Sequence, residues 1–284
     1  MNIKIIADST CDLPKELIQK HNIRIAPLGI SLGDKILQDG VDITSREIFE
    51  YVESGNGICK TSAVNVAEYT EVYQEERPKC DAIIHFIISA DMSSCYQNAR
   101  IAAADFDNIF LVDSRNLSCA IGHLVLDAIE LVEKGMAAED IYREITARVP
   151  LLDSSFVIDT LSYLHKGGRC STIQALASSV LKIKPSIVVA EGKMTVGKKY
   201  RGKLENVLRN YVTDKLSDKE NIDTRRLFIA NTLDAENLAL VDTVKSLATE
   251  ILPFQEVHEA VAGGTISCHC GPNTVGLFFI RNGE

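Results

Sequence analysis

The order of apolar and polar residues in the first half of the chain predicts strands separated by helices. Short apolar runs bounded by polar residues, typical of buried parallel strands, occur at residues 3–7, 23–30, 82–88 and 109–112. Stretches with one apolar face predict helices at 13–21, 45–52, 66–73, 96–104, 118–134 and 138–149. We expect Asp12 to cap the first helix and Gly135 to end the fifth in a left-handed conformation. This alternation indicates a parallel sheet with right-handed crossovers.

The second half of the chain has a different pattern. Strands are expected at residues 155–159, 187–190, 193–198, 226–230, 255–260 and 275–279, and helices at 172–181, 204–216 and 235–247. A turn at Glu191-Gly192 predicts an antiparallel hairpin, so this sheet is expected to be mixed. The preceding helical pattern stops at Pro150. We therefore predict an α/β fold of two domains, 1–150 with a parallel sheet and flanking helices and 151–284 with a mixed sheet.

Composition and charge narrow the class of protein. Of 284 residues, 46% are apolar and 24% charged, which is typical of a folded globular protein and excludes disorder. The 30 Lys and Arg against 39 Asp and Glu give a net charge of −9, whereas a general nucleic-acid binder needs clustered cations. No apolar run approaches the length of a transmembrane helix, and Asp8 falls too early for a signal peptide. We expect a cytoplasmic protein with no nucleic-acid partner.

Eight cysteines raise the question of disulfides or a metal site. Most are scattered singly, and a chain of this length can build a core without disulfides, so we expect reduced thiols. Cys268 and Cys270 flank His269, which suggests a metal ligand set. A structural zinc site usually has a second cysteine pair at loop spacing, and the sequence has none. We therefore expect no bound metal.

Polar residues follow several predicted strands, where open α/β sheets bind ligands. Asp8-Ser9-Thr10 could face such a crevice, or could simply form a turn and a helix start. Ser93, beyond the apolar run at 82–88, has no Gly-x-Ser-x-Gly sequence around it, so a hydrolase is not favoured. Thr61 and Ser62 in a loop before the helix at 66–73 suit an anionic oxygen, although a plain helix cap is the simpler alternative.

Two further turns and a local excess of positive charge are also candidate binding features. In Leu164-His165-Lys166-Gly167-Gly168-Arg169, the glycines permit close backbone approach and Arg169 offers a planar fork for carboxylate or phosphate. His269 lies in a second turn that could place an imidazole in a cleft, or could be an ordinary turn residue. Residues 166–209 contain ten Lys and Arg and two acids, a net +8 in an acidic chain. This segment indicates a specific anionic partner, unless it is only a solvated face.

Taken in order, these motifs resemble the DegV family over nearly the whole chain. The matching motifs are Asp8-Ser9-Thr10, Asp12-Leu13-Pro14, Lys60-Thr61-Ser62, Ser93-Ser94-Cys95-Tyr96-Gln97, Val112-Asp113-Ser114, Leu164-His165-Lys166-Gly167-Gly168-Arg169, Ile183-Lys184-Pro185, Arg201-Gly202 and His269-Cys270-Gly271-Pro272. Each motif is short, and their order along the chain makes the set specific. The sequence departs from the family pattern at Ser94-Cys95, where the family has Gly-Thr, and at Asn273, where it has Gly.

The resemblance implies a two-domain α/β fold that holds a long-chain fatty acid in an apolar cavity between or within the domains. It implies a lipid-binding subunit without catalysis or cofactor of its own, which presents the fatty acid carboxylate to an ATP-dependent fatty acid kinase. The kinase then makes acyl phosphate for phospholipid synthesis in bacteria. By the same resemblance, the carboxylate is bound by Thr61, Ser62, Ser93 and His269. Arg169 and Arg201 lie at the pocket mouth or dock the kinase.

A buried carboxylate must be hydrogen-bonded or paired, and hydroxyls with an imidazole can do this. An acyl tail of about sixteen carbons, at roughly 0.8 kcal/mol per buried CH₂, contributes on the order of 10 kcal/mol before binding costs. The resemblance also allows transient contact with a membrane surface. Two alternatives remain open from the residues: a serine or cysteine hydrolase of acyl esters using Ser93 or Cys95, and a carrier of another amphiphilic lipid.

Overall fold

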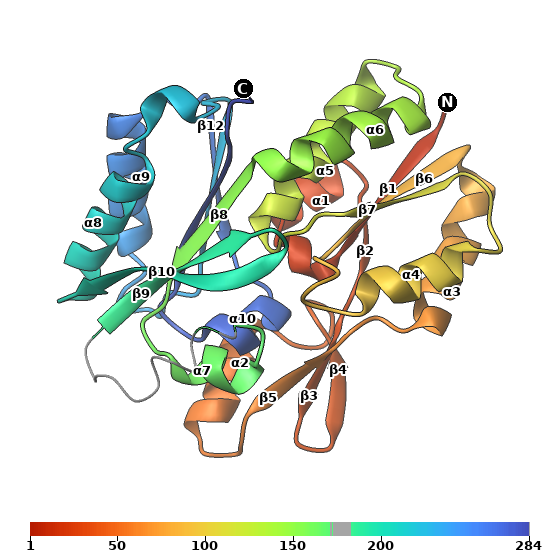
Figure 1. Cartoon of the computed structure of the whole chain (residues 1–284). Helices are drawn as coiled ribbons and strands as arrows, with labels where there is room; N and C mark the ends of the chain where they lie inside the picture. The colour runs from red at the N-terminus through yellow and green to blue at the C-terminus, as the bar shows by residue number, and fades with distance from the viewer. Residues whose placement is uncertain (171, 173–182, 284) are drawn as a thin grey trace.

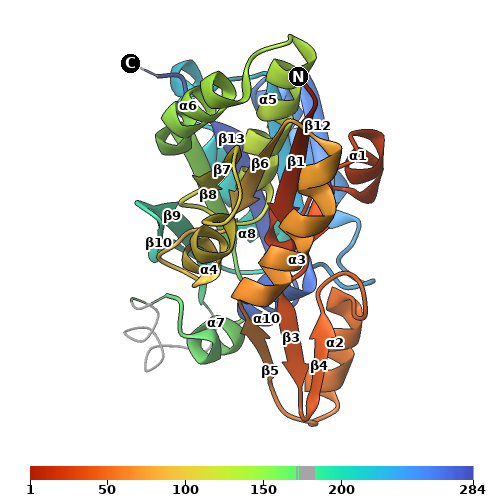
Figure 2. The same ribbon diagram turned by 90° about the vertical axis from the view of Figure 1, so that its right-hand side faces the viewer.

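The computed structural model of the chain describes residues 1–170, 172 and 183–283, and contains three sheets (Figures 1 and 2). The parallel sheet has the order β2-β1-β6-β7. Its strands are β1 (Ile3–Asp8), β2 (Arg24–Ala26), β6 (Ala82–Ile87) and β7 (Ile109–Asp113). All of its pairings are parallel, as predicted, and every residue of β6 is buried because both faces of the sheet are covered.

Helices cover both faces of the parallel sheet. Its outer side carries α3 (Val66–Glu76) and α4 (Cys95–Ala103), as Figure 1 shows. On the other side lie α5 (Cys119–Glu133) and α6 (Ala138–Arg148). The first helix, α1 (Lys15–Lys20), is short and has no fully buried residue. The α/β class predicted for this half is confirmed.

The helix α5 lies between the parallel sheet and the six-stranded sheet, and it contacts strands of both (Figure 1). Twelve of its 15 residues are buried, which explains why its sequence is apolar nearly all round. One buried residue is charged: Asp127 accepts hydrogen bonds from Arg148 at 2.6 Å and from Arg226 at 2.9 Å. Because a buried carboxylate is costly unless it is paired, Arg148 fixes α5 to α6 of the first half and Arg226 fixes it to the second half of the chain.

The six-stranded sheet is mixed, as predicted, with the order β10-β9-β8-β13-β11-β12. Its strands are β8 (Leu152–Val157), β9 (Ile183–Ala190), β10 (Lys193–Arg201), β11 (Arg226–Asn231), β12 (Glu256–Val261) and β13 (Val275–Ile280). Only β11 and β12 pair in parallel among the described strands of this sheet. The β9–β10 turn has Glu191 and Gly192 at φ 50° and 83°, as a tight hairpin requires. Helices α8 (Leu204–Lys215) and α9 (Leu240–Ile251) cover its outer face.

A small antiparallel sheet of three strands was not predicted. It has the order β4-β3-β5 and contains β3 (Gly29–Leu32), β4 (Lys35–Gln38) and β5 (Cys59–Ser62). The expected single strand at 23–30 is wrong, because Pro27 separates β2 from β3 and has no N–H for a sheet ladder. Around this sheet lie α2 (Ser45–Glu53), α7 (Ser162–Gly167) and α10 (Gly264–Cys270), as Figure 2 shows.

Two predicted helix starts are also wrong. The first helix begins at Lys15, because Asp12 has φ 48° and its buried side chain bonds to other parts of the chain. The helix expected at 235–247 begins at Leu240, since the Asp234 carboxylate accepts hydrogen bonds from the next turn's backbone N–H groups. The helix expected at 172–181 lies outside the described residues apart from Thr172.

Pro150 lies in a short 3-10 helix, Val149–Leu151, between α6 and β8. Every described strand of the parallel and three-stranded sheets precedes it, and every described strand of the six-stranded sheet follows it. Helix α10, however, comes from the second half of the chain and packs on α2 and β5 of the first half. We retain the division into 1–150 and 151–284 as a proposal.

Candidate functional site

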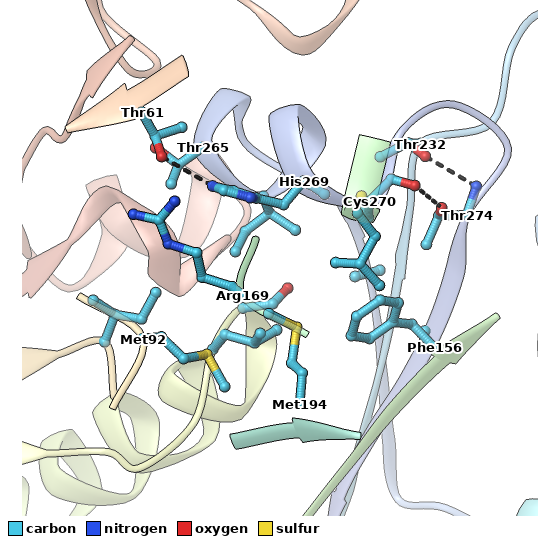
Figure 3. Close-up of a pocket in the computed structure, with 18 of the residues that line it drawn as sticks. Thr61, Met92, Phe156, Arg169, Met194, Thr232, Thr265, His269, Cys270 and Thr274 are labelled. Carbon is cyan, nitrogen blue, oxygen red and sulfur yellow. Dashed lines mark hydrogen bonds between the residues drawn. The ribbon is translucent and has the colours of Figure 1, made fainter. Parts of the chain in front are cut away.

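A pocket lies where the two halves of the chain meet (Figure 3). Its empty volume is about 810 Å³ including the open mouth. Residues from β5, the loop after β6, β8, β10, β11, α10 and β13 line it. Most of its wall is apolar, formed by Leu28, Ile88, Met92, Leu117, Phe156, Leu164, Met194, Ile266 and Phe278. Apart from Leu164, sequence analysis did not single out these residues, because each also matches an ordinary core position.

Thr61 and His269 form the polar side of the pocket (Figure 3). The Thr61 Oγ1 and His269 Nε2 atoms are 2.9 Å apart and share a hydrogen bond. Thr61 is in strand β5 rather than in a loop, and His269 is in the last turn of α10 rather than in an open turn. The alternative that Thr61 or Ser62 caps the next helix is wrong, because Asn65 caps α3 with a full capping box.

The imidazole of His269 is neutral at physiological pH. Burial and, to a lesser extent, the nearby positive charge of Arg169 together lower its pKa to about 4. Its Nδ1 atom is buried and has no hydrogen-bond partner among the described residues. A neutral imidazole has one donor and one acceptor nitrogen, so the bond to Thr61 and the environment of Nδ1 together set the tautomer.

Two aspartates from the first half of the chain hold the start of α10. Asp39 accepts hydrogen bonds from the backbone N–H groups of Gly264 at 2.7 Å and Thr265 at 3.0 Å. Asp12 accepts one from Gly263 at 2.8 Å. Carboxylates are stabilised at a helix N-terminus, where backbone N–H groups are unpaired. No local sequence signal predicts this arrangement, since the aspartates are more than 200 residues from the helix that they hold.

The Asp8-Ser9-Thr10 motif supports this arrangement and does not face the pocket: of the two alternatives, the turn and helix start fits, since Ser9–Cys11 form a 3-10 helix. Ser9 Oγ donates a hydrogen bond to Asp39 at 3.0 Å. Asp8 is fully buried and accepts a hydrogen bond from Tyr69 Oη at 2.7 Å. None of the three residues lines the pocket.

Arg169 lines the pocket immediately after α7. The predicted loop at 164–169 is partly helical, because α7 continues to Gly167 before Gly168 ends it at φ 67°. Arg169 is exposed, and its Nη1 donates a hydrogen bond to the Gly167 carbonyl at 2.8 Å. This contact directs the side chain back toward the Thr61–His269 side of the pocket (Figure 3).

The other predicted residues lie in different places. Ser62 and Ser93 line the pocket. Ser93 Oγ donates to the Cys95 sulfur at 3.2 Å and accepts from the Cys95 backbone N–H at 3.2 Å. Arg201 ends β10, is exposed and does not line the pocket.

Threonines that sequence analysis missed add polar atoms to the pocket. Thr232 and Thr274 are hydrogen-bonded to each other and to the end of α10. The Thr274 backbone N–H donates to Thr232 Oγ1 at 3.0 Å (Figure 3). Thr274 Oγ1 donates to the Cys270 carbonyl at 3.1 Å. In contrast, the buried Thr265 Oγ1 has no hydrogen-bond partner among the described residues. A buried hydroxyl without a partner is costly, so a polar ligand group would stabilise it.

Cys268 and Cys270, considered above as metal ligands, are both in α10 but lie in different surroundings. Cys270 lines the pocket, whereas Cys268 packs in the core beside the three-stranded sheet. Over residues 1–170, 172 and 183–283, no three His, Cys, Asp or Glu side chains are grouped as a metal site. No helix in the same part of the chain is long and apolar enough to span a membrane.

Comparison with known proteins decides the family. Residues 2–282 match the model of a family described as "Uncharacterised protein, DegV family". The chain belongs to the DegV family. A DegV domain-containing protein of Caldanaerobacter subterraneus subsp. tengcongensis is 31% identical over 281 residues, 98% of each chain.

Solved DegV-family structures share the fold. The fatty-acid-binding DegV family protein of Thermus thermophilus has a TM-score of 0.88 at 28% identity, covering 99% of this chain and 100% of its own. A stearic acid-binding protein of Eubacterium ventriosum has a TM-score of 0.85 at 27% identity and covers 98% of both chains. DegV of Bacillus subtilis, a fatty acid binding protein, has a TM-score of 0.84 at 25% identity. The match covers 99% of this chain and 100% of its own. Fatty acid binding is thus a property of solved DegV-family members.

Proposed function

We propose that this protein binds a long-chain fatty acid in the pocket and presents its carboxylate to an ATP-dependent fatty acid kinase. One observation carries the proposal: the wall of the pocket is mostly apolar, and one side of it carries the hydrogen-bonded pair Thr61 and His269. The apolar wall suits an acyl chain, and the polar side suits its head group. The fatty acids bound by DegV-family proteins of known structure support the same ligand class.

In this proposal the carboxylate accepts hydrogen bonds from the polar side of the pocket. Thr61, Ser62 and Ser93 offer hydroxyls, and His269 lines the same side of the pocket with its Nε2 atom bonded to Thr61. We add Thr265, whose buried hydroxyl has no partner in the described part of the chain. Arg169, exposed beside this cluster, is placed to attract the anion and then to contact the kinase or the new phosphate group. Arg201 would act only outside the pocket, in docking the kinase.

We propose that the protein has no catalysis of its own. A serine hydrolase needs a base within hydrogen-bond reach of its nucleophile. The hydrogen bonds of Ser93 Oγ in the described structure go to Cys95, and the Nε2 atom of His269 is bonded to Thr61. Burial also raises the pKa of the Cys95 thiol to about 12, which opposes a thiolate nucleophile. These contacts favour a carrier over the acyl ester hydrolase.

The first experiment is mass spectrometry of an organic extract of the purified, untreated protein. We expect about one long-chain fatty acid per chain. A sterol or other amphiphile in its place would support the alternative carrier. No extracted lipid, together with no binding of added oleate or palmitate, would overturn the proposal. Steady hydrolysis of p-nitrophenyl acyl esters that is lost in Ser93→Ala would support the hydrolase instead.

Presentation to a kinase is tested separately, with the loaded protein, ATP and a bacterial fatty acid kinase. We expect acyl phosphate to form only when both proteins are present. We also propose that the protein is a cytoplasmic lipid-binding subunit that contacts the membrane surface only transiently. Acyl phosphate formed at the same rate without this protein would contradict the presenting role.

A further inference from the structure

Two cysteines face each other behind the polar side of the pocket. Cys59 is the first residue of β5, two positions before Thr61, and Cys268 is in α10, next to His269. The Cys59 Sγ donates a long hydrogen bond of 3.8 Å to the Cys268 carbonyl oxygen, and both residues line the same hollow. The residues are 209 positions apart, so only the tertiary structure brings them together.

The two thiols differ in accessibility. Cys59 is partly exposed, whereas Cys268 is buried. Both line a second, smaller hollow with an empty volume of about 340 Å³, separate from the fatty acid pocket described above. Lys166 and Gly167 of α7 form part of its wall. A small oxidant can therefore reach the pair from outside without entering the main pocket.

The two thiols also differ in acidity. The neighbouring side chain of Cys268 lowers the pKa of Cys59, and the positive charge of Lys166 lowers it further. The neighbouring side chain of Cys59 and burial raise the pKa of Cys268. An accessible, more acidic thiol beside a buried second thiol is the arrangement of redox-sensing cysteine pairs. The other partly exposed cysteine, Cys80, has its pKa raised by burial.

We propose that Cys59 and Cys268 are a redox pair that a hydroperoxide converts into an intramolecular disulfide. The Cys59 thiolate attacks one oxygen of the hydroperoxide: an S–O bond forms, the O–O bond breaks, and the departing alkoxide or hydroxide takes up a proton. The Cys268 sulfur then attacks the Cys59 sulfenic acid: the S–S bond forms, the S–O bond breaks, and hydroxide leaves with the Cys268 proton as water. In total, two thiols are oxidised and one hydroperoxide is reduced.

The disulfide would join β5 to α10, the two elements that carry Thr61 and His269. Since these residues form the polar side of the pocket, the covalent link would hold that side closed and slow the release of ligand. This consequence rests on the proposed function, whereas the formation of the disulfide does not.

The test treats the reduced full-length protein with one equivalent of hydrogen peroxide, blocks the remaining thiols and maps tryptic peptides by mass spectrometry. Peptide 47–60 contains Cys59 as its only cysteine, and peptide 246–281 contains both Cys268 and Cys270. We expect these peptides to be linked in the wild type and in Cys270→Ser, and unlinked in Cys268→Ser. In Cys268→Ser, Cys59 should instead accumulate as a sulfenic acid that dimedone traps.

Cys80 is the matched control for reactivity, since it is also partly exposed. We expect Cys59 to react at least about tenfold faster than Cys80 and to become several-fold slower in Lys166→Ala. Equal rates at Cys59 and Cys80, or a linked peptide that persists in Cys268→Ser, would overturn the proposal.

Ligand release is measured with a fluorescent fatty acid on the oxidised and the reduced protein. We expect slower release after oxidation and recovery with dithiothreitol. Equal release rates would overturn the effect on the pocket while the mapped disulfide stands. If neither form binds the probe, the proposed function fails, and the peptide map still decides whether the thiol pair exists.

Discussion

Gly167 is packed so closely against His269 that a Cβ atom at position 167 would lie 2.2 Å from the imidazole Nδ1. The backbone of α7 thus forms one wall for the ring, while Thr61 holds its opposite nitrogen. The φ of Gly167 is not in the left-handed region, so backbone conformation does not require a glycine here. The close approach of the imidazole does. Gly168, the next residue, has φ 67°, and a Cβ atom there would have nothing within 4 Å, so this glycine serves a different purpose.

We therefore predict that Gly167→Ala displaces the imidazole and breaks its hydrogen bond to Thr61. Fatty acid affinity should fall by about tenfold, the equivalent of roughly 1.4 kcal/mol. Titration with a fluorescent fatty acid measures this. Gly168→Ala is the control: it should cost about 1 kcal/mol of stability through backbone strain and leave affinity unchanged. Equal affinity in the two variants would show that the position of His269 is not needed for binding.

Thr61→Val combined with Ser93→Ala should weaken fatty acid binding by about tenfold to a hundredfold, because each hydroxyl contributes roughly 1 kcal/mol of hydrogen bonding. The circular dichroism spectrum should not change, because both side chains line the pocket and neither is fully buried. Ser94→Ala is the matched control, since Ser94 is exposed and its side chain makes no capping hydrogen bond. Unchanged affinity in the double variant would contradict the assigned carboxylate site.

The neutrality of His269 predicts that its ring does not titrate near neutral pH. Burial and the charge of Arg169 lower its pKa to about 4, so the C2 proton resonance should stay constant between pH 5.5 and 8. In Arg169→Ala the midpoint of the His269 titration should move to higher pH, because the positive charge that helps to lower its pKa is removed. A wild-type midpoint between pH 6 and 7 would contradict the buried, neutral imidazole.

Asp12 predicts a dependence of stability on pH. Burial raises its pKa from 3.8 to about 7 in the folded protein. Between these values the folded protein retains a proton that the unfolded chain releases, so this group makes the protein less stable as pH rises from about 4 to about 7. Urea unfolding measures the free energy of unfolding of the wild type and of Asp12→Asn. The wild-type value minus the variant value should fall by a few kcal/mol between pH 5 and pH 8. A difference that does not change with pH would show that Asp12 is ionised in both states.

Arg169→Ala should retain fatty acid binding and reduce acyl phosphate formation with a kinase by about tenfold or more, because a charge-assisted contact to phosphate or to an acidic partner is lost. Arg143→Ala, on the distant helix α6, removes an exposed arginine of the same kind and should have no effect. Normal acyl phosphate formation in Arg169→Ala would leave this arginine only a structural role.

The sequence by itself determined the elements whose signals are local. Buried strands such as β6 are continuous apolar runs, Gly135 ends α5 with φ 76°, and Glu191-Gly192 forms the predicted hairpin turn. These features depend on neighbouring residues, so one chain without its fold already contains them. The ordered motifs also resemble one family, and that resemblance implied a common site for Thr61, Ser62, Ser93, Arg169 and His269, which all line one pocket.

Only the tertiary structure decided how the polar side of the pocket is built. The partners of His269 are Thr61, 208 residues away, and Gly167, about a hundred residues away, while Asp12 and Asp39 hold the helix that carries it. The same packing places Cys59 against Cys268 and leaves Arg201 outside the pocket. Such contacts join segments distant in sequence, and a short polar segment is equally compatible with a turn, a cap or a ligand site until its partners are known.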